Sequence, residues 1–316
     1  MSILEIKNFN LDIKTELGLR HVLRDVSLTL NQSQMHALVG ESGCGKTMTA
    51  MSVLNLMPKS AVITGGKIFF RGVNLLDFNK KEFENIRGAK IALIPQDSLS
   101  SLNPLYTIGN QLLEIIKKHQ KLEGKAAIER AVEALETVQI PQARERLNSY
   151  PHEFSGGMRQ RAIIAMALAC NAEILIADEP TTALDVTIQS QIMDLLGQIK
   201  KDLGTAILLI THDLALVEGV ADYVSVMYSG RVVESCECKE FFKNPLHPYS
   251  QALLRSLPNP SKSDLDIIKG QAPNIYENIE GCRFNPRCEE VVSCCYQNVP
   301  ELKEVCPAHF AACHLL

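Results

Sequence analysis

Residues 35–48 read Met-His-Ala-Leu-Val-Gly-Glu-Ser-Gly-Cys-Gly-Lys-Thr-Met, an apolar stretch that runs directly into a glycine-rich segment. Residues 40–47 match the pattern G-x-x-x-x-G-K-[ST], and a helical pattern follows over 48–57. Glycines let successive backbone N–H groups curl round a phosphate, and the N-terminus of the following helix adds the positive end of its dipole. The stretch therefore predicts a strand, a phosphate-binding loop and a helix. The loop comprises Gly40, Glu41, Ser42, Gly43, Cys44, Gly45, Lys46 and Thr47.

The last two residues of this loop have separate expected roles. The Lys46 ammonium group would reach the β- and γ-phosphates of a nucleotide, and the Thr47 hydroxyl would ligate Mg²⁺. Cys44 contributes its backbone N–H, so its side chain should be tolerated there. A glycine-rich turn can match the pattern by chance, but the strand before it and the helix after it favour a nucleotide site.

A carboxylate pair supplies the second part of the expected site. Residues 174–180 read Ile-Leu-Ile-Ala-Asp-Glu-Pro. A buried strand that ends in acids places Asp178 at the carboxyl edge of a parallel sheet, where α/β proteins bind ligands. Asp178 suits the coordination sphere of Mg²⁺, and Glu179 could accept a proton from an attacking water.

Ser155-Gly156-Gly157 predicts a second anion site, because it opens a helical pattern over 159–170. Two phosphate-binding helix ends are more than one bound nucleotide needs. We therefore expect a head-to-tail dimer, in which each nucleotide lies between the phosphate loop of one subunit and residues 155–157 of the other.

Taken together, these motifs resemble the ATP-binding subunit of an ABC transporter over residues 1 to about 240. The family signature LSGGQ reads Phe-Ser-Gly-Gly-Met at 154–158, and Ala-Leu-Asp at 183–185 matches the D-loop. The resemblance implies that Gln96 is the Q-loop glutamine, which senses Mg²⁺ and the membrane partner, and that His212 contacts the γ-phosphate. It implies an ATPase with Mg²⁺ held by Thr47, Gln96 and Asp178, and with catalytic residues Glu179, His212, Gln96 and Lys46. Ile13 stands where many members carry an aromatic residue that stacks on adenine, so base recognition is expected to be apolar.

Three further segments, 96–104, 150–161 and 244–249, resemble the dipeptide/oligopeptide/nickel importer subfamily. The resemblance implies that ATP hydrolysis powers import of peptides or a related small solute through two transmembrane permease subunits. It also implies a second ATP-binding subunit, paralogue or self, and indirectly a solute-binding protein. The segment Asn-Pro-Leu-His-Pro-Tyr at 244–249 is expected to be rigid, with Tyr249 exposed. The alternative is a soluble ABC-type ATPase not coupled to transport, but the tandem nucleotide domains or long coiled-coil insertions of such proteins are not evident in this sequence.

Ten cysteines are present, and six of them fall after residue 281. No pair of C-x-x-C motifs exists, so a zinc ribbon is not indicated, although four thiolates can hold Zn²⁺ or a [4Fe–4S] cluster equally well by count. The subfamily has a C-terminal C-x5-C-x6-C…C-H region that is similar to an iron–sulfur site in some members. By that register the ligands are Cys282, Cys288, Cys295 and Cys313. A cluster, zinc and reduced structural thiols stay open as alternatives, as does a redox sensor that gates the ATPase.

Composition sets the remaining limits. The 316 residues are 46% hydrophobic and 22% charged with a net charge of −4, which excludes disordered, collagen-like and coiled-coil chains. No apolar run reaches the length of a bilayer span, no secretory signal is visible, and the slight acidity gives no hint of a nucleic-acid partner. We expect a peripheral protein at the cytoplasmic face of the membrane.

The expected fold class is α/β: a P-loop NTPase with a mixed or parallel sheet core, a helical subdomain and a small Cys-rich extension. The ATP-binding domain would span 1–240, with the helical subdomain at about 97–170. The extension would span 241–316, with its cysteine-rich segment at 282–314. Strands are expected at 3–6, 36–39, 91–94, 174–177, 207–210 and 223–227.

Overall fold

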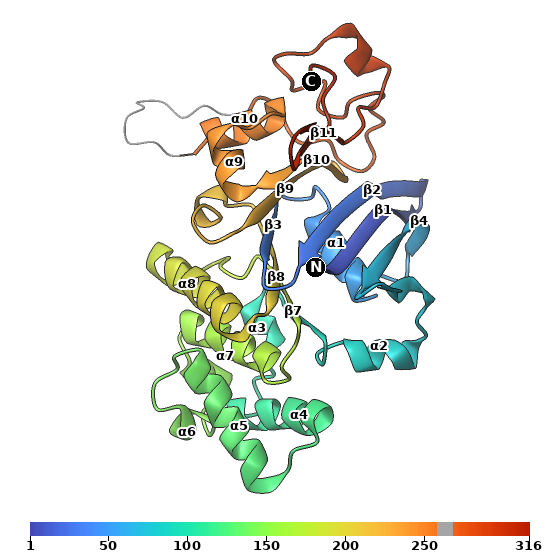
Figure 1. Ribbon diagram of the computed structural model, residues 1–316. Coiled ribbons are helices and arrows are strands. Elements are labelled where there is room, and N and C mark those ends of the chain that lie inside the picture. Colours follow the sequence, from blue (N-terminus) through green and yellow to red (C-terminus); the bar gives the residue numbers. More distant parts are fainter. Residues whose placement is uncertain (258–267) are drawn as a thin grey trace. The chain divides into compact units, whose positions relative to one another are not determined.

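The computed structural model describes residues 1–257 and 268–316 in two compact units (Figure 1). The first unit comprises Met1–Asp77 and Ile210–Leu316, and the second comprises Phe78–Leu209. Residues 258–267, within the expected C-terminal extension, lie outside the described residues.

An antiparallel sheet in the first unit is built on a long hairpin. β1 (Ser2–Thr15) and β2 (Gly18–Asn31) pair along their length, and β4 (Ala61–Phe70) with β5 (Val73–Asn74) continues the sheet in the order β2-β1-β4-β5. A register shift follows Ile6, where Asn8 adopts a φ of 45°. This bulge interrupts the alternation of buried and exposed residues, so the sequence pattern shows only the first part of β1.

The other strands of the first unit join residues far apart in the sequence. β3 (Met35–Val39) is buried throughout and pairs in parallel with β9 (Tyr223–Tyr228), which pairs with β10 (Arg231–Glu237). The C-terminal extension then adds β12 (His309–Ala311) to β10, and β11 (Lys303–Cys306) to β12. The extension is therefore continuous with the sheet that contains β3, β9 and β10.

The helices of the first unit connect and flank these strands. They are α1 (Lys46–Val53), η1 (Leu75–Asp77), η3 (Leu214–Leu216), α9 (Cys238–Lys243), α10 (Pro248–Arg255) and η4 (Ser293–Tyr296).

The second unit is mainly helical, and its polar residues cap its helices. Asn79 caps α2 (Lys80–Ile86) in a capping box, and Thr107 caps α4 (Ile108–Gln120). The remaining elements are α3 (Ser98–Ser101), α5 (Gly124–Thr137), α6 (Ala143–Arg146), η2 (Pro151–Glu153), α7 (Gly156–Leu168), α8 (Val186–Leu203) and the parallel strands β6 (Ile91–Ile94) and β7 (Ile174–Asp178). The strand β8 (Ala206–Thr211) carries the chain from this unit into the first.

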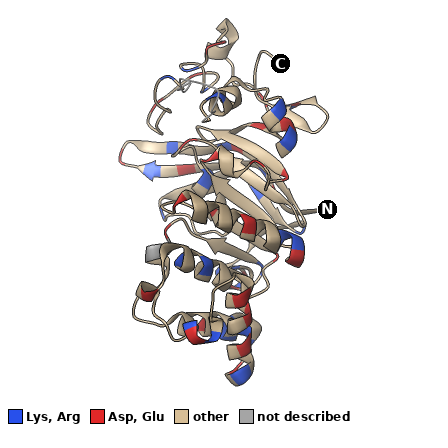
Figure 2. Cartoon of the chain, turned by 90° about the vertical axis from the view of Figure 1, so that its left-hand side faces the viewer, with Lys and Arg blue, Asp and Glu red and all other residues tan. Residues whose placement is uncertain are grey.

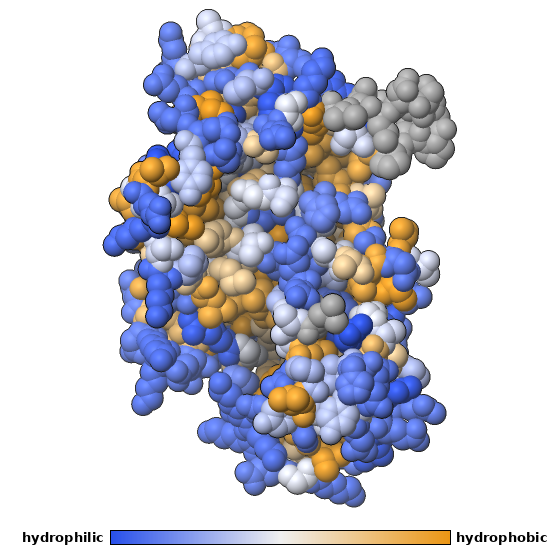
Figure 3. Space-filling model, turned by 180° about the vertical axis from the view of Figure 1, so that it is seen from behind, coloured by the Kyte–Doolittle hydropathy of each residue, from blue (hydrophilic) through white to orange (hydrophobic). Residues whose placement is uncertain are grey.

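All six strands expected from the sequence are present, and the predicted α/β class is confirmed. The sequence did not predict the length of β1 beyond residue 6, nor the strands β2, β4, β5, β10, β11 and β12. Acidic and basic residues are interleaved along the helices in Figure 2, in keeping with the small net charge. Hydrophobic residues reach the surface in separate patches in the view of Figure 3. Among the described residues, no helix combines the length and apolarity that crossing a membrane requires.

Candidate functional site

The phosphate-binding loop lies in the first unit between β3 and α1, as the sequence predicts. Gly40 has a φ of 153°, and a Cβ there would collide with the carbonyl oxygen of Met227. Gly45 has a φ of 112°, and its Cβ would lie 2.8 Å from Leu23 Cδ2. The loop can approach β9 and β2 this closely only because these positions lack side chains.

Lys46 is nearly buried and turns back across the loop. Its side-chain Nζ donates to the carbonyl oxygens of Gly40 at 2.7 Å and Glu41 at 3.0 Å. Cys44 is 5% exposed, and burial raises the pKa of its thiol, so the thiol is neutral at physiological pH. Its carbonyl oxygen accepts from Gly230 N at 2.8 Å, which ties the loop to the β9–β10 turn.

Asp178 and Glu179 lie in the second unit at the end of β7. Asp178 is 2% exposed, and Glu179 follows in the left-handed backbone region with a φ of 47°. One carboxyl oxygen of Glu179 accepts from Gln96 Nε2 at 2.8 Å and from Thr182 Oγ1 at 3.0 Å. The structure therefore brings together two of the residues that the sequence singled out, Gln96 and Glu179, although they lie far apart in the chain.

Ser155 is the N-cap of α7 in the same unit, and its Oγ accepts from Met158 N at 3.3 Å. A Cβ on Gly157 would lie 2.8 Å from Ile188 Cγ2, so glycine lets the start of α7 pack against α8. Phe154, which replaces the leucine of the family signature, is 3% exposed. Its role is therefore to anchor the segment in the core, and a bulkier apolar residue serves that role.

His212 follows β8 in the first unit, and its side chain is exposed. The next residue, Asp213, donates its backbone N–H to Thr211 Oγ1 at 3.0 Å and accepts from Ala215 N at 2.9 Å. These local bonds fix the backbone on both sides of the histidine.

Comparison with known proteins identifies the family. Residues 23–182 match the family described as "ABC transporter", and residues 233–295 match "Oligopeptide/dipeptide transporter, C-terminal region". The chain belongs to the ABC transporter family. It is an ABC-type ATPase, as the sequence predicts.

Individual relatives agree with this assignment. The dipeptide transport ATP-binding protein DppD of Lactococcus lactis is 44% identical, over 99% of this chain and 91% of its own length. The oligopeptide transport ATP-binding protein OppD of Bacillus subtilis is 42% identical, over 99% of this chain and 89% of its own. A dimeric ATP-binding cassette solved in a post-hydrolysis state with ADP and Pi superposes with a TM-score of 0.66, at 26% identity, over 74% of this chain and 98% of that one.

In the C-terminal extension of this ABC ATPase, four cysteines lie near enough to one another for their thiols to affect each other's pKa. Burial, together with the neighbouring Cys295, Cys288 and Cys313, raises the pKa of Cys282 to about 11. Burial likewise raises the pKa of Cys288 and of Cys313, with contributions from the other cysteines of the set. The four residues are those of the predicted register, so they form one group in space.

Tyr249 corrects an expectation drawn from the sequence. It was expected to be exposed, but it is 0% exposed and its hydroxyl accepts from Glu41 N at 3.1 Å. Its ring lies against Tyr228 and Phe284, at centroid distances of 4.6 and 5.3 Å. Residues 247–249 are therefore buried, and Tyr249 connects this part of the extension to the phosphate-binding loop.

The hairpin that carries Ile13, the position of the missing adenine-stacking aromatic, contacts the extension through a neighbouring residue. Ile13 pairs with Arg20 across β1 and β2, and the Arg20 guanidinium lies 5.6 Å from the ring centroid of Tyr276. Tyr276 is 51% exposed. An aromatic ring from the extension therefore lies beside the hairpin, which sequence reasoning missed because the two segments are distant in the chain.

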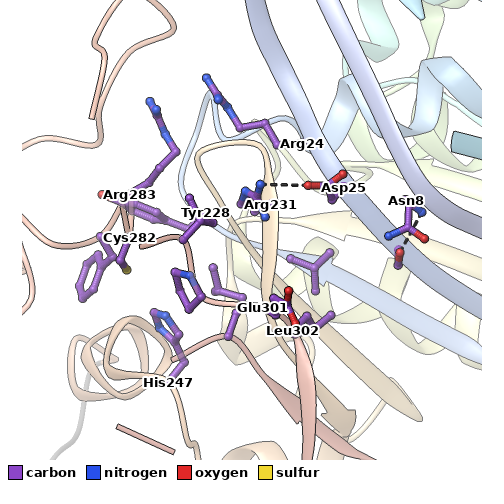
Figure 4. Close-up of a pocket in the computed structure, with 17 residues that line it drawn as sticks. Asn8, Arg24, Asp25, Tyr228, Arg231, His247, Cys282, Arg283, Glu301 and Leu302 are labelled. Carbon is purple, nitrogen blue, oxygen red and sulfur yellow. Dashed lines mark hydrogen bonds and ion pairs between the residues drawn. The ribbon is translucent and has the colours of Figure 1, made fainter. Parts of the chain in front are cut away.

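A cavity of about 480 Å³ lies between part of the extension and strands β1, β2 and β10 (Figure 4). Cys282 and Arg283 line it from the extension, and Arg24 and Arg231 line it from β2 and β10. Arg231 forms an ion pair with Asp25 at 3.0 Å, the dashed contact in Figure 4. Burial, followed by repulsion from Arg283 and Arg231, lowers the pKa of Arg24. The boundary between the extension and strands β2 and β10 is therefore partly polar.

Proposed function

We propose that this chain is the ATP-hydrolysing subunit that powers import of di- or oligopeptides, or a related small solute, through partner membrane permeases. The observation that carries the proposal is the Gln96–Glu179 contact, because it joins the family's partner-sensing glutamine to the carboxylate that would activate water. The match of residues 233–295 to a peptide-transporter region and the names of the relatives support the cargo class.

In the proposed reaction, the loop 40–47 cradles the phosphates of ATP, and Lys46 moves from its loop carbonyls to the β- and γ-phosphates. Thr47, Asp178 and Gln96 would hold Mg²⁺, which would neutralise phosphate charge. Glu179 accepts a proton from the attacking water, and His212 contacts the γ-phosphate. Positioning and charge neutralisation supply most of the catalysis in phosphoryl transfer.

The proposed assembly contains two ATP-binding subunits, this chain with a second copy or a paralogue. Ser155, Gly156 and Gly157 of one subunit would close over the nucleotide on the loop of the other. Leu105 and Tyr106, 80% and 54% exposed, follow the Gln96 segment and offer an apolar surface to two permease subunits. The chain would then lie at the cytoplasmic face of the membrane and act indirectly on a solute-binding protein.

We also propose that Cys282, Cys288, Cys295 and Cys313 hold a [4Fe–4S] cluster. A single Zn²⁺ with Zn–S bonds of about 2.3 Å needs its sulfur ligands roughly 3.8 Å apart. Among the described residues, the group of three metal-binding side chains whose ligand atoms all lie within 4.8 Å is Glu234, Cys236 and His309, and the four thiols of the extension do not reach that spacing. The cluster is preferred to zinc because the C-x5-C-x6-C…C-H register resembles the iron–sulfur region of some importer subunits.

The variant Glu179→Gln tests the proposed function. We expect it to bind ATP, to lose at least roughly 100-fold in turnover because it lacks the base, and to accumulate as a closed dimer in ATP. In cells it should abolish uptake of labelled di- and oligopeptides while uptake of free amino acids continues. Glu129→Gln, on the exposed face of α5, is the matched control and should leave both unchanged.

Near-normal hydrolysis by Glu179→Gln would remove Glu179 from the catalytic role. Normal peptide uptake in cells, despite lost hydrolysis, would favour the alternative of an ABC-type ATPase that is not coupled to peptide transport.

A further inference from the structure

Two contacts from the C-terminal extension meet at Glu41, the second residue of the phosphate-binding loop. The Arg287 guanidinium donates to both carboxyl oxygens of Glu41, from Nη1 at 2.7 Å and from Nη2 at 2.9 Å. The backbone N–H of Glu41 donates to Tyr249 Oη at 3.1 Å. Both the side chain and the backbone of this loop residue are therefore fixed by the extension.

Glu41 is also connected to the phosphate-binding groups themselves. Its carbonyl oxygen accepts from Lys46 Nζ at 3.0 Å and from Cys44 N at 3.3 Å. A shift of the Glu41 backbone would consequently change the curl of the loop and the starting position of the Lys46 ammonium group.

Arg287 is held rigidly. Its side chain is 5% exposed, Nε donates to Lys269 O at 3.0 Å, and the guanidinium lies 5.8 Å from the Tyr228 ring centroid. The hydrogen bonds to Glu41 raise the pKa of Arg287, so it stays charged. A planar guanidinium that donates two parallel hydrogen bonds to a carboxylate fixes the orientation of that carboxylate as well as neutralising its charge.

The loop that carries Arg287 begins and ends with the proposed thiol ligands. Arg287 directly precedes Cys288, and its backbone N–H donates to Phe284 O at 3.0 Å. At the other end, Cys282 N donates to Cys295 O at 2.8 Å. Anything that holds the four thiols together therefore holds the backbone from which Arg287 projects.

We propose that Arg287 is a positioning residue of the nucleotide site: it fixes the phosphate-binding loop through Glu41 and links ATP affinity to the state of the four-thiol site. This inference rests on the proposed function only in that the thiols bind a metal centre. The direct link between Arg287 and the loop stands on the contacts alone.

The first test measures the dissociation constant of MgATP in the full chain carrying Glu179→Gln, so that ATP is not consumed. Adding Arg287→Gln should weaken binding roughly tenfold, within the range usual for coupled sites. Glu41→Gln should weaken it similarly, and the two changes together should be no worse than either alone. Arg287→Lys keeps the charge and should recover part of the affinity.

Arg255→Gln is the matched control, because this arginine pairs with Glu289 of the extension at 3.4 Å but is exposed and does not contact the loop. It should leave ATP affinity unchanged. Equal affinity of wild type, Arg287→Gln and Glu41→Gln would overturn the inference. If Arg287→Gln fails to fold, Arg287→Lys and Glu41→Gln decide it by the same measurement.

The second test follows the metal centre by iron and sulfide content and by absorbance, with anaerobically purified protein. Removing the metal with a chelator should weaken MgATP binding by the same factor as Arg287→Gln, and should have no further effect in that variant. A metal-free preparation would refute the proposed cluster but not the loop contact. Bound metal whose removal leaves ATP affinity unchanged would overturn the link between the two sites.

Discussion

At the scale of single residues, Glu179 shows how the site depends on one backbone conformation. A φ of 47° is costly for a residue with a side chain, on the order of 1–3 kcal/mol. The buried strand β7 before it and the bonds from Gln96 and Thr182 hold it in place. In this conformation the carboxylate lies within hydrogen-bonding distance of Gln96.

Two buried histidines make the stability of the fold depend on pH. Burial lowers the pKa of His36 and of His247 from 6.5 to about 4. His36 lies between Thr29 O at 2.9 Å and Ser225 Oγ at 2.8 Å, and His247 Nδ1 accepts from Tyr249 N at 3.0 Å. Both arrangements suit a neutral ring.

The unfolded chain binds protons at these histidines below pH 6.5, whereas the folded chain does so only near pH 4. The free energy of unfolding should therefore fall as pH drops from 6.5 to 4, by up to about 3 kcal/mol for each histidine. Denaturant titrations at several pH values measure this slope. His247→Asn, which keeps an acceptor for Tyr249 N, should reduce the slope, while His152→Gln at an exposed site should not. A slope unchanged in His247→Asn would contradict the assignment.

At the scale of elements, a comparison of the N-caps Ser155 and Thr107 distinguishes a purely structural cap from one that also contacts the nucleotide. Each accepts a backbone N–H at the start of a 13-residue helix, Ser155 from Met158 at 3.3 Å and Thr107 from Asn110 at 3.2 Å. Ser155→Ala and Thr107→Ala should each cost about 1 kcal/mol of unfolding free energy. Only Ser155→Ala should also lower ATP turnover, on the order of 100-fold, because it removes a phosphate ligand from the proposed dimer. Equal turnover in the two variants would show that Ser155 is only a cap.

The elements also show what the sequence could and could not predict. The phosphate-binding loop, the Asp178-Glu179 pair and the Ser155 cap are contiguous motifs whose chemistry is local, so residue type and spacing suffice. The Glu41–Arg287 pair and the burial of Tyr249 join segments about two hundred residues or more apart, and no local pattern encodes them. Tyr249 was wrongly expected to be exposed because its proline-rich segment reads as a surface turn.

At the scale of the whole chain, one buried carboxylate ties the extension to the ATP-binding fold. Glu234 on β10 is 0% exposed, and its Oε1 accepts from Leu246 N and from His309 Nε2, each at 2.8 Å. Its Oε2 accepts from His247 N at 2.8 Å. The carboxylate thus joins β10, the segment before α10 and β12 at one point, which explains how a small extension with little core of its own stays attached.

Glu234→Gln should release the extension. The amide nitrogen of glutamine is a donor, so in either orientation it faces at least one of these N–H groups, and the buried donor is left unpaired. We expect a loss of roughly 3 kcal/mol in unfolding free energy and faster proteolysis within residues 268–316, measured by denaturant titration and timed digestion. Glu237→Gln, on the same strand but exposed, is the control and should behave as wild type. Because Arg287 reaches Glu41 only from an attached extension, Glu234→Gln should also weaken MgATP binding. If Glu234→Gln loosens the extension but leaves MgATP affinity unchanged, attachment of the extension does not control the phosphate-binding loop.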